Sequence, residues 1–150
     1  MAKKDKNPSN YICLLSVHGL IRGHDLELGR DADTGGQTKY VVELARALAQ
    51  QNDASRVDLI TRLIDDGSID AAYARPRETL DSNASIIRVE AGPAGYIAKE
   101  MLWEYLDTFA DNVIEYLRGQ VRLPDILHSH YADAGYVGSR VAHVLGIPLI

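Results

Sequence analysis

The sequence is apolar almost without interruption from Tyr11 to Val17, where it reads Tyr-Ile-Cys-Leu-Leu-Ser-Val. A run of this kind suits a strand that is buried on both faces, as in a parallel sheet. The run contains Cys13, the only cysteine of the chain, so the sequence allows neither an internal disulfide nor a cysteine zinc site. We expect Cys13 to be a buried, inert, small hydrophobic residue.

Beyond this run, strand-like and helix-like apolar patterns alternate along the chain. Short apolar runs predict further strands at 57–61, 85–89 and 126–130, and the beginning of another at 147–150. Apolar residues at helical spacing predict helices over 40–48, 102–117 and 136–145. Such alternation predicts an α/β fold, a Rossmann-like doubly wound parallel sheet with helices on both faces.

Two segments are expected to lie outside this alternation. Residues 1–10 are polar and carry several lysines, and they predict a flexible tail. Residues 65–83 are polar and contain Gly67 and Pro76, and they predict an irregular excursion or a short helix.

The overall composition limits the classes of function. The chain has 150 residues, of which 46% are hydrophobic and 25% charged, and its formal net charge is -5. This is the composition of one soluble globular domain. The acidic balance argues against a nucleic-acid partner, because phosphate neutralisation needs clustered Lys and Arg. No apolar run approaches the roughly 18 residues of a membrane span, and no secretory signal is present, so we expect a cytoplasmic protein without a membrane partner.

Loops at the carboxyl ends of parallel strands are where open α/β sheets bind ligands. Three such loops are expected, at 18–36, 92–99 and 130–133. The loop at 18–36 is much longer than a usual connection between a strand and a helix, which has about 2–6 residues. Its length is typical of a binding loop, and the alternative is a solvated surface excursion.

The most distinctive motif of the chain is Asp33-Thr34-Gly35-Gly36-Gln37. Thr34 and Gln37 have the spacing of a capping box, which places the two glycines in the first turn of a helix. Glycine is a poor helix former, but its missing Cβ lets a sugar or phosphate approach the free N–H groups there. The alternative is a simple tight turn. The motif is neither a phosphate-binding loop of the Gly-Lys-Ser/Thr type nor a Gly-x-Gly-x-x-Gly dinucleotide motif.

Polar side chains gather at the end of the expected strand 126–130. His128 and His130 are two residues apart in the expected strand, so their side chains lie on the same face. A metal site would need further ligands from other loops, such as His18 or Asp133, so we expect no metal. We expect His128 to serve in the core or in a hydrogen bond. His130, Tyr131 and Asp133 are candidates for polar ligand contacts, and Asp133 is also placed to cap the following helix.

Lys99 follows a Gly-Pro-Ala-Gly turn and comes just before an expected helix. The helix dipole disfavours a cation at this end, so a bound anion nearby would explain the lysine. The alternative is an ordinary solvated lysine. Trp103, the only tryptophan, is expected to pack in the core or at a domain face.

Four motifs occur in order along the chain, at 15–23, 29–43, 99–106 and 128–135. Their central parts read Ser-Val-His-Gly, Arg-Asp-Ala-Asp-Thr-Gly-Gly-Gln-Thr-Lys-Tyr, Lys-Glu-Met-Leu-Trp and His-Ser-His-Tyr-Ala-Asp. Together they resemble the start of the glycosyltransferase domain of the sucrose-phosphate synthase family. Sucrose synthase shares the Asp-Thr-Gly-Gly-Gln core and the His-x-His-Tyr region.

The resemblance implies a two-domain GT-B type enzyme, in which two Rossmann-like domains face each other across a cleft. Residues 11–150 correspond to the amino-terminal acceptor domain, apparently truncated before the donor-binding domain, and we expect this chain alone to be inactive. The implied reaction moves glucose from UDP-glucose to fructose 6-phosphate with retention, giving sucrose 6-phosphate and UDP, without a tightly bound cofactor. Sucrose synthase, another retaining glycosyltransferase and a non-catalytic sugar-phosphate-binding half domain are the alternatives.

The resemblance also implies roles for particular residues. Gly35 and Gly36 contact the phosphates and sugar of the donor, and Gln37 adds a polar contact in the cleft. Lys99 meets the phosphate of fructose 6-phosphate. The hydroxyl groups of acceptor or donor are oriented by His130, Tyr131 and Asp133.

Overall fold

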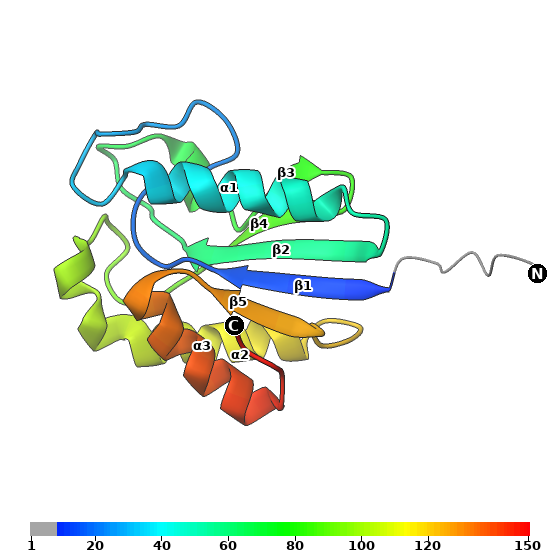
Figure 1. Cartoon of the computed structure of the whole chain (residues 1–150). Helices are drawn as coiled ribbons and strands as arrows, with labels where there is room; N and C mark the ends of the chain where they lie inside the picture. Colours follow the sequence, from blue (N-terminus) through cyan, green and yellow to red (C-terminus); the bar gives the residue numbers. More distant parts are fainter. Residues whose placement is uncertain (1–8) are drawn as a thin grey trace, which may run out of the picture.

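The computed structural model describes residues 9–150, which form one α/β unit (Figure 1). Its strands are β1 (Asn10–Leu15), β2 (Ala54–Arg62), β3 (Arg77–Asp81), β4 (Ala84–Val89) and β5 (Ile126–Ser129). Its helices are α1 (Gly36–Ala49), α2 (Leu106–Arg118) and α3 (Tyr131–Leu145). Three short 3-10 turns complete it: η1 (Ala71–Ala74), η2 (Lys99–Met101) and η3 (Trp103–Tyr105).

The sheet has the strand order β3-β4-β2-β1-β5. Four of its strands run parallel, which confirms the predicted Rossmann-like sheet. The exception is β3, which pairs antiparallel with β4 at the edge, inside the segment expected to be irregular. Its sequence, Arg-Glu-Thr-Leu-Asp, is short and charged, as suits an edge strand, and therefore lacks the apolar run by which the other strands are recognised.

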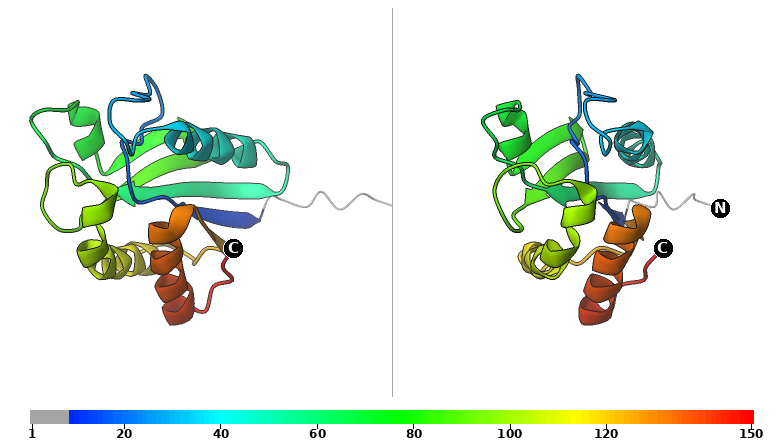
Figure 2. Two further views of the ribbon diagram at one scale, coloured as in Figure 1. Left: turned by 60° about the vertical axis from the view of Figure 1, so that its left-hand side comes forward. Right: turned by 90° about the vertical axis from the view of Figure 1, so that its left-hand side faces the viewer.

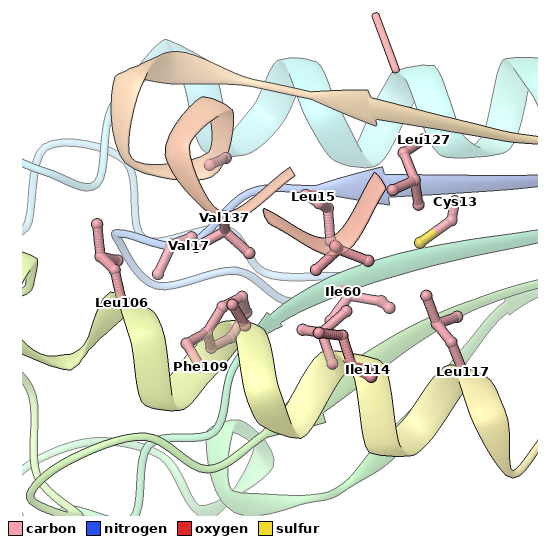
Figure 3. Close-up of a cluster of buried hydrophobic side chains, with 14 of the residues drawn as sticks. Cys13, Leu15, Val17, Ile60, Leu106, Phe109, Ile114, Leu117, Leu127 and Val137 are labelled. Atoms are coloured by element: carbon pink, nitrogen blue, oxygen red, sulfur yellow. The ribbon is translucent and has the colours of Figure 1, made fainter. Parts of the chain in front are cut away.

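Helices cover both faces of the sheet, as predicted (Figures 1 and 2). On one face, Leu14 packs with apolar residues of α1. On the other, Cys13 and Leu15 join a larger cluster with α2 and α3 (Figure 3). β1 is thus buried on both sides, which explains its unbroken apolar sequence, and Cys13 is fully buried as expected.

The structure shows how far the predictions for the two ends of the chain hold. Of the expected tail, residues 1–8 lie outside the described part, whereas Asn10 belongs to β1 and its N–H donates to the Asp53 carbonyl at 3.0 Å. At the other end, Leu149 forms an isolated parallel bridge with Leu127, in line with the predicted beginning of a strand. No helix formed by residues 9–150 has the length and apolarity that crossing a membrane requires.

The segment before α2 differs from the prediction. The expected helix over 102–117 begins only at Leu106, and residues 99–105 instead form the turns η2 and η3. Lys99 therefore opens a short 3-10 turn and does not lie at the start of a long helix. Trp103 is 48% exposed and lies edge-on against Tyr136 of α3, which excludes the core position.

Candidate functional site

The three predicted loops meet at the edge of the sheet where the parallel strands end, on the left of Figure 1. The first and second loops are joined by the Lys99 N–H, which donates to the Asp33 carboxylate at 2.7 Å. The first and third are joined by His18, whose Nδ1 lies 2.8 Å from Asp133 Oδ2. The carboxyl edge of the sheet is therefore a single polar region built from distant parts of the chain, as the strand order requires.

The start of α1 is open. Gly35 is the N-cap residue, Gly36 begins the helix, and within the described part of the chain no side-chain cap hydrogen bond forms at this end. A Cβ at either position would meet no heavy atom within 4 Å, and neither residue has a positive φ. Gly19 is different, because its φ is +82° and a Cβ would lie 2.6 Å from the Asp33 carbonyl oxygen. Neither packing nor backbone conformation requires glycine at 35 and 36, so what they provide is free access to the helix N–H groups.

The predicted capping box is wrong. The Thr34 hydroxyl is buried, accepts the Leu20 N–H at 3.1 Å and donates to Asp31 at 2.9 Å, so it stabilises the long loop. The Gln37 amide donates to the Ser16 hydroxyl at 3.3 Å, just after β1. Gln37 is half-buried at the open helix start, where sequence analysis placed a ligand contact.

His18 and Asp133 form a buried pair, with side chains 4% and 1% exposed. The helix-capping role predicted for Asp133 is wrong, because His130 is the N-cap residue of α3 and has no side-chain cap bond. Asp133 instead lies in the first turn of α3 and faces His18. A carboxylate beside Nδ1 favours the tautomer that carries a proton on this nitrogen, and it fixes the orientation of the ring. The sequence indicated His18 and Asp133 only as further ligands that a metal site would need, and it did not predict their hydrogen bond, because they are 115 residues apart.

Tyr131 connects this pair to Lys99. It has a left-handed backbone with φ of 77°, a strained conformation for a non-glycine residue and one that clusters at functional sites. Its half-exposed ring lies edge-on to the His18 ring, with centroids 4.8 Å apart. The Lys99 ammonium lies 5.3 Å from the centre of the same ring. Three of the residues in this group, Lys99, Tyr131 and Asp133, are predicted site residues, and the structure brings them together.

The Lys99 ammonium also lies 3.9 Å from carboxylate oxygens of Asp33 and Glu100. Tyr131 foremost, and then Glu100 and Asp33, raise the pKa of Lys99. The side chain is 28% exposed, so the charged group is available to a ligand at this edge.

His130 is buried and carries an unsatisfied ring nitrogen. Its Nε2 has no hydrogen-bond partner within residues 9–150, and its ring lies 5.6 Å from that of Tyr40 on α1. Burial, and secondarily His128, lower the pKa of His130 to about 4. A buried polar atom without a partner is rare, so Nε2 is available to a ligand near α1. The described residues contain no group of three or more His, Cys, Asp or Glu that could hold a metal ion.

The low pKa of His130 predicts that the fold loses stability on mild acidification. An unfolded histidine has a pKa of about 6.5, so between that value and about 4 the unfolded state binds more protons. The free energy of unfolding is therefore highest above the unfolded pKa and falls as the pH decreases towards the folded pKa. Between pH 7 and pH 4 the loss is roughly 2–3 kcal/mol. Urea unfolding of the wild type and His130→Gln at pH 7 and pH 4 measures this. An equal loss in both proteins contradicts the prediction.

Comparisons with known proteins agree on one family. Residues 8–149 match the family model described as the first GT-B domain of sucrose synthase. Probable sucrose-phosphate synthase 1 of Oryza sativa subsp. indica is 40% identical over 98% of this chain. Sucrose-phosphate synthase 4 of Arabidopsis thaliana is 43% identical over 99% of it. The chain spans 16% of the length of each of these relatives.

A solved structure gives the same result. Sucrose-phosphate synthase from Thermosynechococcus elongatus superposes with a TM-score of 0.75 at 28% identity, covering 94% of this chain and 32% of that chain. The parallel sheet and the open start of α1 thus occur in a chain whose relatives carry the sucrose-phosphate synthase name. The chain belongs to the GT-B glycosyltransferase family of the sucrose synthase first domain, and it is one half of that two-domain fold.

Proposed function

We propose that this chain is the acceptor-holding domain of a sucrose-phosphate synthase. The whole enzyme would transfer glucose from UDP-glucose to fructose 6-phosphate with retention, giving sucrose 6-phosphate and UDP. The observation that carries the proposal is the open start of α1, where Gly35 and Gly36 are required by neither packing nor backbone conformation. Residues 11–150 would form one wall of the cleft, and a donor-binding domain would form the other.

In the proposed site, the N–H groups at Gly35 and Gly36 stabilise the negative charge that develops on the departing UDP. Gln37 adds a polar contact to the donor or acceptor. The Lys99 ammonium binds the phosphate of fructose 6-phosphate, a charge-assisted contact. Sugar hydroxyls are held by the residues at the start of α3, namely His130, Tyr131 and Asp133. Asp133 contributes indirectly, because its carboxylate orients the His18 ring.

The chemistry needs no tightly bound cofactor. The bond between the anomeric carbon and the donor phosphate breaks, the acceptor hydroxyl oxygen forms a bond to that carbon on the same face, and a donor phosphate oxygen takes the hydroxyl proton. This chain would contribute to catalysis in two ways: it positions the acceptor, and it stabilises the charge on the leaving group.

Sucrose synthase, with free fructose as acceptor, is the second candidate, because the matching family model carries that name. Titration of this chain with fructose 6-phosphate and with fructose, followed by calorimetry and amide NMR, distinguishes them. Selective binding of the phosphate sugar, with shifts at Gly35, Gly36 and Lys99, supports the first candidate. Equal binding of both sugars supports the second. Absence of any binding contradicts an acceptor site that is complete within this chain.

Gly36→Ala is expected to preserve the fold and to weaken donor binding tenfold or more, which corresponds to about 1.4 kcal/mol or more. A Cβ at this position meets no heavy atom of residues 9–150 within 4 Å, and alanine favours a helix by up to about 1 kcal/mol. The same methyl group obstructs a phosphate that approaches the helix N–H groups. Thermal unfolding of this chain measures the first effect, and titration of the whole two-domain enzyme with UDP-glucose measures the second.

Gly67→Ala is the matched control, because a Cβ there also meets no heavy atom of residues 9–150 within 4 Å and the exposed residue does not belong to α1. It should leave UDP-glucose binding unchanged. If Gly36→Ala binds as the wild type does, the glycines do not serve a ligand.

The 150-residue chain by itself is expected to transfer no glucose. Catalysis requires both reactants to be held together and water to be excluded, and one wall of a cleft does neither. Incubation with UDP-glucose and fructose 6-phosphate, with chromatographic detection of sucrose 6-phosphate, tests this. Product above the background of a boiled sample would show that the second domain is dispensable.

A further inference from the structure

The Asp33 carboxylate joins the two loops that flank the open helix start. Its Oδ2 atom accepts the backbone N–H of Lys99 at 2.7 Å and the Tyr96 hydroxyl at 2.9 Å. Asp33 is 7% exposed, and both bonds are partly buried. It also precedes Gly35 by two residues, so one buried side chain connects the position of Lys99 to the start of α1.

Tyr96 reinforces this junction from the second loop. Its hydroxyl lies 2.9 Å from Asp31 as well as from Asp33, and its backbone N–H donates to Asp66 at 3.0 Å. Asp31 is itself held in place by the N–H groups of Asp33 and Thr34. The Tyr96 hydroxyl therefore bridges two fixed carboxylates, and its loop cannot move away without breaking both contacts.

The earlier part of the same loop is anchored separately. The guanidinium of Arg62 is buried and donates to the carbonyls of Ala91, Pro93 and Gly95. Within residues 9–150 it has no carboxylate partner, so its hydrogen-bonding capacity is spent on the loop backbone. The loop thus has one anchor at 91–95 and a second at Tyr96 and Lys99.

Lys99 has few other contacts: its ammonium lies 5.3 Å from the centre of the Tyr131 ring, and its carbonyl oxygen accepts the Leu102 N–H at 3.2 Å. It belongs to a 3-10 turn of three residues whose N-cap makes no side-chain bond. Its ammonium lies 3.9 Å from its carboxylate neighbours, a distance that does not define one geometry. The bond from its N–H to Asp33 is the short contact that locates the residue.

We propose that Asp33 and Tyr96 are positioning residues that fix Lys99 for recognition of an acceptor phosphate. The inference rests on the proposed function and deepens it, because it assigns phosphate selectivity to a buried carboxylate and hydroxyl that do not touch the ligand. Loss of either group leaves Lys99 charged but mobile, which weakens binding of the phosphate sugar and leaves binding of fructose unchanged.

The test uses this chain, with fructose 6-phosphate and fructose as ligands in calorimetry. Tyr96→Phe removes only the hydroxyl, and we expect it to weaken fructose 6-phosphate binding about fivefold, the loss of roughly one hydrogen bond. Asp33→Ala removes both contacts and should weaken it further, whereas Asp33→Asn, which keeps an acceptor oxygen, should recover part of the affinity. Fructose binding should be unaffected in all of them.

Tyr73→Phe is the matched control. Tyr73 packs in the same small apolar cluster as Tyr96, and its hydroxyl also donates to a carboxylate, that of Glu27, at 2.7 Å. We expect it to change the affinity for fructose 6-phosphate by less than about twofold. Wild-type selectivity in both Tyr96→Phe and Asp33→Ala, or an equal effect of Tyr73→Phe, overturns the proposal while leaving the proposed function in place.

If the wild-type chain does not select the phosphate sugar, the proposed function is contradicted. A second measurement then tests the positioning of Lys99 by itself. Hydrogen exchange of the Lys99 amide reports its bond to Asp33 without any ligand. Exchange that is slow in the wild type and in Tyr73→Phe, and fast in Asp33→Ala, supports positioning of Lys99 by Asp33. Unchanged exchange in Asp33→Ala overturns it.

Discussion

Asp58→Ala is expected to lower the free energy of unfolding by about 3–5 kcal/mol, the usual cost of breaking a buried ion pair. Asp58 is fully buried in β2. Its Oδ2 atom accepts the hydroxyls of Tyr11 at 2.6 Å and Tyr116 at 2.9 Å. The Arg56 guanidinium donates to both of its oxygens, at 3.1 and 2.7 Å. Alanine would leave one guanidinium and two hydroxyls without their common acceptor between the sheet and α2.

Urea unfolding followed by circular dichroism measures this loss. Asp111→Ala is the control, because Asp111 also pairs with an arginine, Arg140, but on the surface of α2 and α3. Exposed pairs of this kind contribute about 0–1 kcal/mol. If Asp58→Ala destabilises the protein no more than Asp111→Ala does, the buried network makes no net contribution to stability.

Lys99→Gln is expected to weaken binding of fructose 6-phosphate roughly tenfold or more and to leave binding of fructose unchanged. Glutamine keeps most of the length of the side chain but removes the charge that the phosphate requires. Lys99→Arg keeps the charge and should keep part of the selectivity. Calorimetric titration of the three proteins with both sugars gives the ratio of affinities directly.

Lys39→Gln provides the comparison for a general effect of charge. Lys39 lies on the exposed side of α1, 3.7 Å from Glu43, and is 53% exposed. Its removal lowers the net charge by the same amount at a position that takes no part in the proposed site. Similar losses in Lys39→Gln and Lys99→Gln would mean that long-range attraction, and not a phosphate contact, explains the selectivity.

The parts of the fold that follow from local sequence could be predicted. The apolar run of β1 indicated burial on both faces, and Leu14 and Leu15 indeed pack on opposite sides of the sheet. The end of α2 at Arg118 and of α3 at Leu145 follows from the residues at these positions, and Gly146, the C-cap residue after α3, has the left-handed φ of 67° that such a position favours.

What could not be predicted depends on contacts between distant residues. Thr34 and Gln37 have the spacing of a capping box, but their side chains bind Leu20 and Ser16, and no spacing rule contains those contacts. The same holds for β3, whose charged sequence becomes a strand because β4 offers it an edge. The candidate residues at the start of α3 were identified by their place after a strand, whereas the His18–Asp133 pair required the three-dimensional fold.

The sequence separation between the residues that build the site also affects when the site forms during folding. His18 and Asp133 are 115 residues apart, and Asp33 and Lys99 are separated by 66. Contacts between distant residues form slowly, because the chain entropy of closing the loop is lost before the contact stabilises anything. The site needs β5 in place beside β1, so any intermediate that lacks this pairing has helices and strands but no complete site. Ligand-binding competence thus requires the long-range pairing of β1 with β5, which local formation of helices and strands does not supply.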